Sequence, residues 1–101
     1  MSEELHHKDF AGCVNDKFRV VGEYTAPVSL ELIQVSEEKI TQKQHIFSVL
    51  FRGPADRFIP QRTYKLKHHR LGEVEIFLVP VGQDKEGFQY QAVFNRLTQS
   101  A

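Results

Sequence analysis

The spacing of hydrophobic residues changes once along the chain. Near the N-terminus, Phe10, Cys13 and Val14 have the i, i+3, i+4 spacing of one helix face. The polar residues 2–4 are suited to the start of a helix. This pattern predicts a short amphipathic helix over residues 4–14.

Beyond this helix, hydrophobic and polar residues alternate, and a period of two is typical of β-strands. The segments with this pattern are separated by turn signals such as Gly53-Pro54. The predicted strands span 17–22, 29–37, 45–51, 62–68, 73–81 and 88–95. Short strands at this spacing predict a mainly β fold, a six-stranded antiparallel barrel or roll with a short N-terminal helix. We expect residues 1–101 to form a single domain.

Two of the predicted strands carry signs of irregularity. In the second strand the hydrophobic set shifts by one position between Leu32 and Ile33, which is how a β-bulge shows in a sequence. In the fifth strand Pro80 has no N–H to donate, so it should lie at a bulge or a strand end. Residues 31–44 also have fair helix propensity, and a helix there is the main alternative to this assignment.

The most basic stretch of the chain is YKLKHHRLG, from Tyr64 to Gly72. Its lysines and histidines raise the question of a metal site or a nucleic-acid contact. A hairpin that joins His68 to Gly72 through the loop 69–71 explains the pattern better, because it places the hydrophobic side chains of both strands on one face and the charged side chains on the other. The predicted cross-strand pairs are Leu66 with Val74, Tyr64 with Ile76, Lys67 with Glu73, and Lys65 with Glu75. Carboxylates opposite both lysines favour an ordinary hairpin over a phosphate-binding face.

Composition and charge exclude several classes of partner. The 13 Lys and Arg residues balance the 13 Asp and Glu residues, so no net field attracts nucleic acid or anionic lipid. No hydrophobic run approaches the length that crosses a membrane. The single cysteine, Cys13, cannot form an internal disulfide, which fits a reducing compartment. We therefore expect a cytoplasmic protein that contacts neither nucleic acid nor membrane.

Candidate catalytic and metal-binding groups are sparse. The histidines include adjacent pairs at 6–7 and 68–69, and none has the spacing of an HxH, HxxxH or HExxH motif. Cys13 has no histidine nearby in the sequence to act as its base. Residues 82–88 have the glycine spacing of a phosphate loop, but Phe88 replaces the lysine and no helix is predicted to follow. We predict no catalytic residue, metal ligand or cofactor, and the alternative is a site assembled from distant strands.

The loop 52–62 is the first candidate interface. It combines arginines with aromatic and aliphatic side chains, a composition typical of interface hot spots. The candidate residues are Arg52, Arg57, Phe58 and Ile59. The alternative is that Phe58 and Ile59 close one end of the barrel while the charged side chains are solvated.

The second candidate interface is a strand, 73–81, that is hydrophobic on both faces. Its outward residues are Phe77, Val79 and Val81, and Val93 of the next strand is expected beside them. A half-buried strand has polar residues there, so something should cover this face. The N-terminal helix, through Phe10 and Val14, can cover part of it. A homo-oligomer or a protein partner is expected on the rest.

Three motifs give the chain a family resemblance. The chain contains, in this order, FSVLFRGP (Phe47–Pro54), LGEVEIFLVPVG (Leu71–Gly82) and YQAVFN (Tyr90–Asn95). Together they resemble the pattern of a small bacterial domain family of unknown function, over nearly the whole chain. The resemblance implies no reaction, cofactor or catalytic residue. For similar small proteins it suggests an association with phage-tail-like gene products, which is a hypothesis about the partner.

These observations favour an uncharacterised small bacterial β-domain that acts as a non-catalytic binding or assembly module. The alternative from another class is a small hydrolase or metal-dependent enzyme whose histidines meet in one cavity. A third hypothesis is an accessory protein of a phage-tail-like system. Metal content, and the convergence of three histidines on one cavity, distinguish the first two hypotheses.

Overall fold

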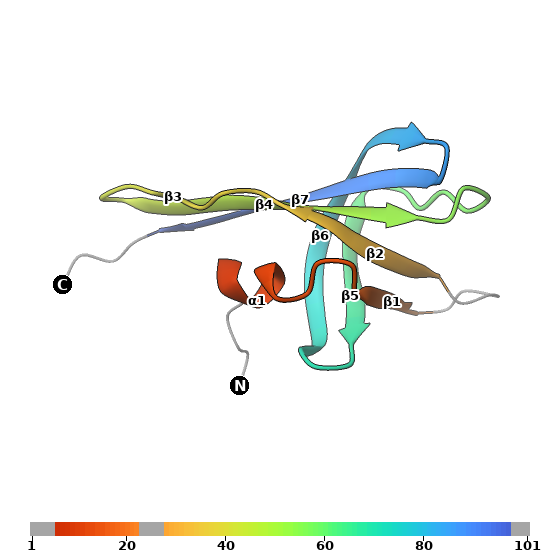
Figure 1. Ribbon diagram of the computed structural model, residues 1–101, viewed down its shortest axis with the longest axis horizontal. Coiled ribbons are helices and arrows are strands. Elements are labelled where there is room, and N and C mark those ends of the chain that lie inside the picture. The colour runs from red at the N-terminus through yellow and green to blue at the C-terminus, as the bar shows by residue number, and fades with distance from the viewer. Residues whose placement is uncertain (1–5, 23–27, 98–101) are drawn as a thin grey trace.

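Antiparallel strands dominate the computed structural model, which describes residues 6–22 and 28–97 (Figure 1). One helix, α1, spans His7–Ala11. The strands are β1 (Lys17–Val21), β2 (Ser29–Val35), β3 (Lys39–Ile40), β4 (Gln44–Gly53), β5 (Arg62–His68), β6 (Gly72–Asp84) and β7 (Gly87–Leu97). The prediction of a mainly β fold is confirmed, and residues 31–44 contain strands and irregular connections instead of a helix.

Six of these strands close into an antiparallel barrel. Their order is β2-β1-β5-β6-β7-β4, and pairing between β2 and β4 closes the ring. β3 is an extra strand on β4, where Lys39 pairs with Ile46 and Ile40 with His45.

The hydrophobic pattern does not predict β3, because a strand of two residues has no period and both of its residues are exposed.

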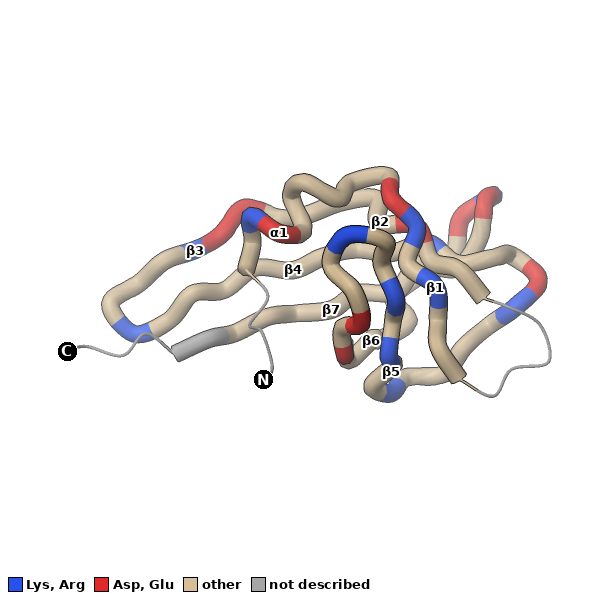
Figure 2. Tube along the Cα trace, turned by 90° about the horizontal axis from the view of Figure 1, so that it is seen from below, with Lys and Arg blue, Asp and Glu red and all other residues tan. Residues whose placement is uncertain are grey.

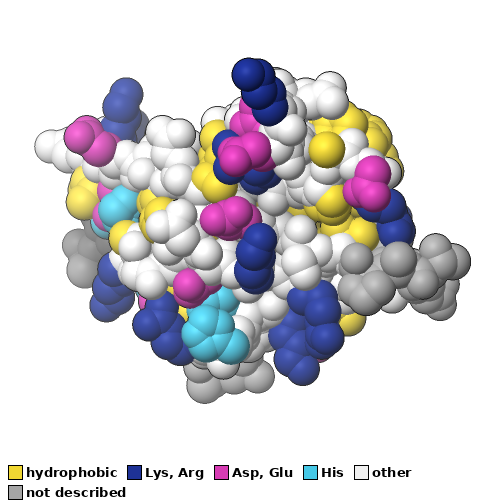
Figure 3. Space-filling model, turned by 45° about the vertical axis from the view of Figure 1, so that its right-hand side comes forward, with side chains coloured by type: hydrophobic (Ala, Val, Ile, Leu, Met, Phe, Trp, Pro, Cys, Tyr) yellow, Lys and Arg dark blue, Asp and Glu magenta, His cyan; other side chains and the backbone are white. Residues whose placement is uncertain are grey.

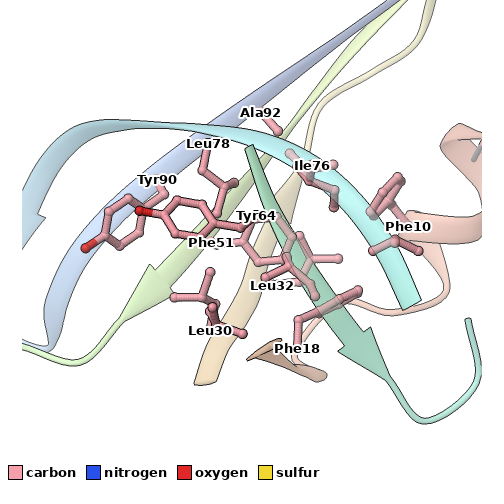
Figure 4. Close-up of a cluster of buried hydrophobic side chains, with 14 of the residues drawn as sticks. Phe10, Phe18, Leu30, Leu32, Phe51, Tyr64, Ile76, Leu78, Tyr90 and Ala92 are labelled. Atoms are coloured by element: carbon pink, nitrogen blue, oxygen red, sulfur yellow. The ribbon is translucent and has the colours of Figure 1, made fainter. Parts of the chain in front are cut away.

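Alternate residues of each strand fill the barrel, as their period of two predicts. The buried barrel residues are Phe18, Val20, Leu30, Leu32, Val49, Phe51, Tyr64, Leu66, Val74, Ile76, Leu78, Tyr90 and Ala92. Figure 4 shows many of these side chains gathered from different strands into one interior. Because these residues fill the hydrophobic core, the residues on the outer faces of the same strands are available for other contacts.

The N-terminal helix is shorter than predicted. It ends before Gly12, which is its C-cap. The chain then continues in a tighter turn, in which the N–H of Cys13 donates to the carbonyl oxygen of Phe10 at 2.8 Å. Val14 therefore lies outside the helix and is 38% exposed. Residues 2–4, which suit a helix start, lie outside the described residues.

Both predicted irregularities are present. In β2 the register with β4 shifts between Leu32 and Gln34, so Ile33 is the extra residue of a bulge. In β6 the register with β7 shifts between Pro80 and Gly82. Pro80 thus lies beside a bulge, where a missing N–H disrupts the ladder least.

The β5–β6 hairpin has the predicted register. Lys65 pairs with Glu75 and Lys67 with Glu73, and all four side chains are exposed. Figure 2 shows the basic positions of β5 beside the acidic positions of β6. The basic stretch is therefore one strand of an ordinary hairpin whose lysines face carboxylates.

The strands β3, β4 and β7 extend beyond the barrel as a three-stranded arm (Figure 1). β4 pairs with β7 as far as Leu97, which lies opposite Gln44. β6 pairs with β7 only up to Gln91, which lies opposite Val79, and then diverges from it. The arm forms because the long strand β7 continues along β4 after β6 has turned away.

The helix α1 packs against the inner face of this arm. The Phe10 ring centroid lies 6.0 Å from that of Phe47 and 5.1 Å from that of Phe94. His7 adds an edge-to-face contact with Phe47 at 5.3 Å. Phe10 is fully buried as a result, so α1 extends the hydrophobic core from the barrel onto the arm.

Candidate functional site

One group of possible ligand atoms lies close together. Cys13 Sγ, an Asp16 carboxylate oxygen and a His68 ring nitrogen are all within 4.8 Å of one another, the one such group found among residues 6–22 and 28–97. Cys13 and Asp16 come from the connection between α1 and β1, and His68 ends β5. Because these residue types occur in zinc sites and in thiol enzymes, their hydrogen bonds decide what they can do.

The hydrogen bonds of His68 determine where its proton lies. Its Nδ1 is 3.1 Å from the backbone nitrogens of both Arg70 and Leu71, and each N–H can only donate. Nδ1 therefore accepts, and the neutral ring carries its proton on Nε2. Nε2 donates this proton to Asp16 Oδ2 at 2.8 Å. This hydrogen bond lowers the pKa of the Asp16 carboxyl.

This tautomer argues against a metal ion at His68. A neutral histidine that binds a metal through Nε2 carries its proton on Nδ1, where it would point at two backbone N–H groups. A metal on Nδ1 would displace those same N–H donors and break the turn 69–71. The ring is 1% exposed and held on both edges, so it cannot turn without losing these bonds.

The thiol of Cys13 is also engaged. It donates to the carbonyl oxygen of Asp9 at 3.1 Å and accepts from Arg70 Nη2 at 3.2 Å. Arg70 Nη2 also donates to the carbonyl oxygen of Gly12 at 2.9 Å. Neither nitrogen of His68 is available to take the thiol proton, and Cys13 is buried. The arrangement therefore lacks the base and the access that a thiol nucleophile requires.

We name this group the His68 clasp, and it consists of Cys13, Asp16, His68 and Arg70. It joins the connection between α1 and β1 to the turn between β5 and β6. On its other side the connection is held to β2, because the Asn15 N–H donates to the Leu32 carbonyl oxygen at 2.6 Å and the Leu32 N–H donates to that of Asp16 at 3.0 Å. The clasp thus positions the segment that carries α1 onto the barrel.

Three other histidines line one small cavity of about 260 Å³. Its walls are formed by His6, His7, Lys8, Glu38 and His45. His7 Nε2 donates to the carbonyl oxygen of Ser36 at 2.8 Å, and His45 Nδ1 lies 3.4 Å from Glu38 Oε2. This convergence is the one that the alternative hypothesis of a metal-dependent enzyme requires, and the sequence could not show which histidines take part, because that depends on how α1 docks onto the arm.

Arg52, a predicted interface residue, is paired within the chain. Its Nη2 lies 2.7 Å from Asp84 Oδ2 and its Nη1 lies 3.1 Å from Glu86 Oε2. The hydrogen bond from Arg52 lowers the pKa of Asp84 from 3.8 to about 2. Asp84 Oδ1 accepts the backbone N–H groups of Glu86 and Gly87 at 2.8 and 3.0 Å. Residues 82–88 therefore form a hairpin connection and not a phosphate loop.

The rest of the loop 52–62 divides between the two predicted roles. Ile59 is buried, and its N–H donates to the hydroxyl oxygen of Tyr90 at 3.0 Å, so this residue closes the end of the barrel. Phe58 is 57% exposed and contacts Phe88 edge-to-face, with ring centroids 5.3 Å apart. Arg57 is half-buried beside it. The interface role predicted for this loop is thus left to Phe58 and Arg57.

Hydrophobic side chains on β6 and β7 form an uncovered strip on the outside of the sheet. We name it the outer patch, and it consists of Phe77, Val79 and Val93. Phe77 is 50% exposed and Val93 is 63% exposed, while Val79 is half-buried. Val79 lies opposite Gln91, whose neighbour on the same face of β7 is Val93. Val81, at the bulge of β6, is also 50% exposed.

The expectation that α1 covers this outer face is wrong. The helix lies on the other face of the arm, where Phe10 contacts Phe47 and Phe94. Val14, the second residue expected to cover the face, is outside the helix. The outer patch is therefore exposed in the single chain.

A comparison of the sequence with known protein families gives one match. The family described as Domain of unknown function (DUF6916) matches residues 5–94. The chain belongs to this family. No curated protein and no solved structure matches the chain. The DUF6916 match covers the His68 clasp, the histidine-lined cavity and the outer patch, and it assigns none of them a role.

In the part of the chain that is described, no helix has the length and hydrophobicity to cross a bilayer.

Proposed function

We propose that this DUF6916 protein is a non-catalytic binding or assembly module that uses the outer patch. The supporting observation is the exposure of Phe77 and Val93 on a sheet whose other face is already packed. A sheet that packs on one side normally has polar residues on the other. Hydrophobic side chains on adjoining strands therefore mark a surface that another protein covers.

The charge distribution supports a protein as the binding partner. Lys and Arg side chains are intermixed with Asp and Glu side chains on the face shown in Figure 3, and the chain as a whole has no net charge. Nucleic acid and anionic lipid require a surface of one sign. Within this proposal the protein works in the cytoplasm, where a free thiol such as that of Cys13 stays reduced.

The chemistry of the His68 clasp also favours a non-catalytic role. Both ring nitrogens of His68 and the thiol of Cys13 have partners within the chain. A catalytic group keeps a lone pair or a proton available for a substrate, and these groups do not.

The substitution Phe77→Asp tests the proposal, since Phe77 is half exposed and the variant should fold. We expect the parent to form a complex, with a second copy or with a protein of its native host, and the variant to lose it. Ile40→Asp is the matched control, because Ile40 is 64% exposed and lies on β3, outside both the outer patch and the loop 52–62. Sedimentation of the pure proteins and co-purification from the host report the complex. A folded Phe77→Asp variant that keeps the assembly size and the partners of the parent would contradict the proposal.

The histidine-lined cavity supports a second candidate function, metal binding, for which its side chains must draw closer, because their ligand atoms do not form a close group like that of the His68 clasp. A backbone carbonyl oxygen holds His7 Nε2, and a carboxylate holds His45 Nδ1. Oxygen acceptors of this kind orient the histidines of metal sites and leave the opposite ring nitrogen for the ion. Metal analysis of the protein purified without an affinity tag tests this function, and a stoichiometric transition metal that His45→Ala removes would support it. A protein without metal that does not bind added Zn²⁺ would exclude it.

A further inference from the structure

The arm has one open edge, along β7. From residue 92 to Leu97, β7 has β4 on one side. On its other side no strand of the described chain pairs with it, because β6 leaves β7 after the pair of Val79 and Gln91. Figure 2 shows β7, up to the part drawn in grey, along the border of the arm. An unpaired edge of this kind is a template for another strand.

The hydrogen bonds of β4 identify which groups face this edge. The Ser48 N–H donates to Ser36 Oγ at 2.8 Å, and its carbonyl oxygen accepts the Ser36 N–H at 2.9 Å. Both groups of Ser48 therefore point away from β7. In an antiparallel pair, two opposed residues either both direct their N–H and C=O groups toward each other or both direct them away. Because Ser48 directs its groups away from β7, Val93, which lies opposite, directs its N–H and C=O away from β4. Asn95, two residues further, does the same.

The two edges of the arm differ in charge. The edge formed by β3 is two residues long, and Glu37, Glu38, Lys39 and Lys43 lie along it and its flanks. Charged residues and short strands are the usual protection of an edge against pairing. Residues 87–95 of β7 contain no Lys, Arg, Asp or Glu, and Figure 2 shows this stretch without a charged position. The β7 edge has one charged residue, Arg96, near its end, so the part that contains Val93 and Asn95 lacks the protection that the β3 edge has.

We infer that the β7 edge pairs with the β7 edge of a second copy, in an antiparallel pair around a two-fold axis; this inference rests on the proposed function and specifies its partner. In the shortest such register Val93 lies opposite Asn95 of the other copy, and Asn95 opposite its Val93. Both residues direct their backbone groups to the edge, so each pair forms two hydrogen bonds. The two arms become one continuous sheet.

Three properties of β7 favour a second copy as the occupant. A two-fold axis requires a self-complementary surface, and residues 87–95 carry no charge; in this register the one charged residue of β7, Arg96, lies opposite Ala92 of the other copy, so no like charges are paired. Phe94 lies at the axis and meets Phe94 of the other copy, which is a favourable cross-strand pair. Val93 places the outer patches of both copies side by side, which adds hydrophobic area to an interface that backbone pairing alone would leave small.

Substitutions of Asn95 test this pairing. Asn95→Pro removes the N–H that faces the edge and leaves the hydrogen bonds to β4 in place. Asn95→Lys keeps the backbone and adds the charge that protects edges. We expect the parent to sediment as a dimer, and both variants to raise the dimer dissociation constant about tenfold or more. The matched control is Ile40→Lys, at the charged edge of the arm, which should leave the dimer unchanged.

Amide exchange gives a second measurement that is independent of the variants. In the parent dimer the amides of Val93 and Asn95 should exchange slowly, and dilution below the dissociation constant should make them fast. A parent that is monomeric at all concentrations overturns the inference. So does an Asn95→Lys variant that folds and dimerises as the parent does; this variant decides the test if Asn95→Pro fails to fold. If Phe77→Asp abolishes the complex while the Asn95 variants keep it, the proposed function stands and only the edge pairing fails.

Discussion

At the scale of single residues, His68 shows how a polar side chain can be part of a hydrophobic barrel. Apart from the hydroxyls of Tyr64 and Tyr90 and the thiol of Cys13, it is the only polar side chain among the buried residues described, and its ring packs against Phe18 with centroids 4.6 Å apart. Burial of an imidazole is costly unless both nitrogens have partners. Asp16 and the backbone of the turn 69–71 provide these partners, so the ring stabilises the turn and the α1–β1 connection together.

Replacing His68 with alanine should lower the free energy of unfolding by about 2–4 kcal/mol. The substitution leaves a cavity in the core and removes the acceptor of the Arg70 and Leu71 N–H groups. Urea unfolding measures the loss. Gln42→Ala is the control, because Gln42 is exposed in the connection between β3 and β4, and it should change the free energy of unfolding by less than about 0.5 kcal/mol. Equal effects of the two substitutions would show that the clasp does not stabilise the fold.

The ion pair of Asp84 with Arg52 should make stability depend on pH in the acid range. The pKa of Asp84 in the folded protein, about 2, is below its ordinary value of 3.8. A lowered pKa means that the ionised form favours folding, so the contribution is present above pH 3.8 and is lost as the pH falls through about 2. The free energy of unfolding of Asp84→Asn should therefore be below that of the parent at neutral pH and approach it in acid. Asp56→Asn, on an exposed loop position, is the control, and a gap that does not change with pH would contradict the assignment.

At the scale of elements, α1 depends on tertiary contacts. A helix of five residues is too short to be stable alone in water. It is held by Phe10, which packs between the arm and the barrel, and by the clasp that follows it. The hydrophobic spacing of Phe10, Cys13 and Val14 correctly indicated an amphipathic helix, but Gly12 ends it early, and only Phe10 and Cys13 are buried.

Replacing Phe10 with alanine should lower the free energy of unfolding by about 3–5 kcal/mol. The side chain is fully buried and contacts the rings of Phe47 and Phe94, so its removal leaves a large cavity under the arm. Thermal and urea unfolding measure the effect. Val14→Ala, at a position outside the helix that is 38% exposed, should cost far less. A small loss for Phe10→Ala would mean that the arm and barrel hold together without α1.

The sequence predicted the strands well because most of them have one face in the core. β5 runs over the predicted residues, and the bulge at Ile33 was visible in the hydrophobic pattern. The arm could not be predicted, because it arises where β6 leaves β7, and no local pattern records that point. The clasp was missed for a similar reason. The alternation of Tyr64, Leu66 and His68 places His68 inward, but Asp16 is distant in the sequence and no spacing links the two.

At the scale of the whole molecule, balanced charge limits what the surface can attract. Across the β5–β6 hairpin each lysine faces a carboxylate, and the 13 basic residues are matched by 13 acidic ones. Exposed pairs of this kind stabilise by only about 0.2–1 kcal/mol each, so they matter more for register and for neutrality than for stability.

The protein should bind duplex DNA no better than a neutral control protein. Fluorescence anisotropy of a labelled duplex at low and at physiological salt measures the affinity. The variant Glu73→Lys with Glu75→Lys, which removes both carboxylates opposite the lysines, should gain weak affinity that salt abolishes. Measurable affinity of the parent with a steep salt dependence would show that the basic stretch binds phosphate after all.

The position of β7 between β4 and β6 has a consequence for synthesis of the chain. It is the last strand in the sequence, yet the ring cannot close until it lies between two strands that were made before it. A nascent chain that ends at Asp84 can form the β5–β6 hairpin and the pair of β2 with β4, but β4 and β6 would each present a bare edge to the solvent. Folding must then wait for contacts between residues far apart in the sequence, which are slow to form. During that interval the ribosome-bound chain exposes hydrophobic strands, and this is the stage at which chaperones should be needed most.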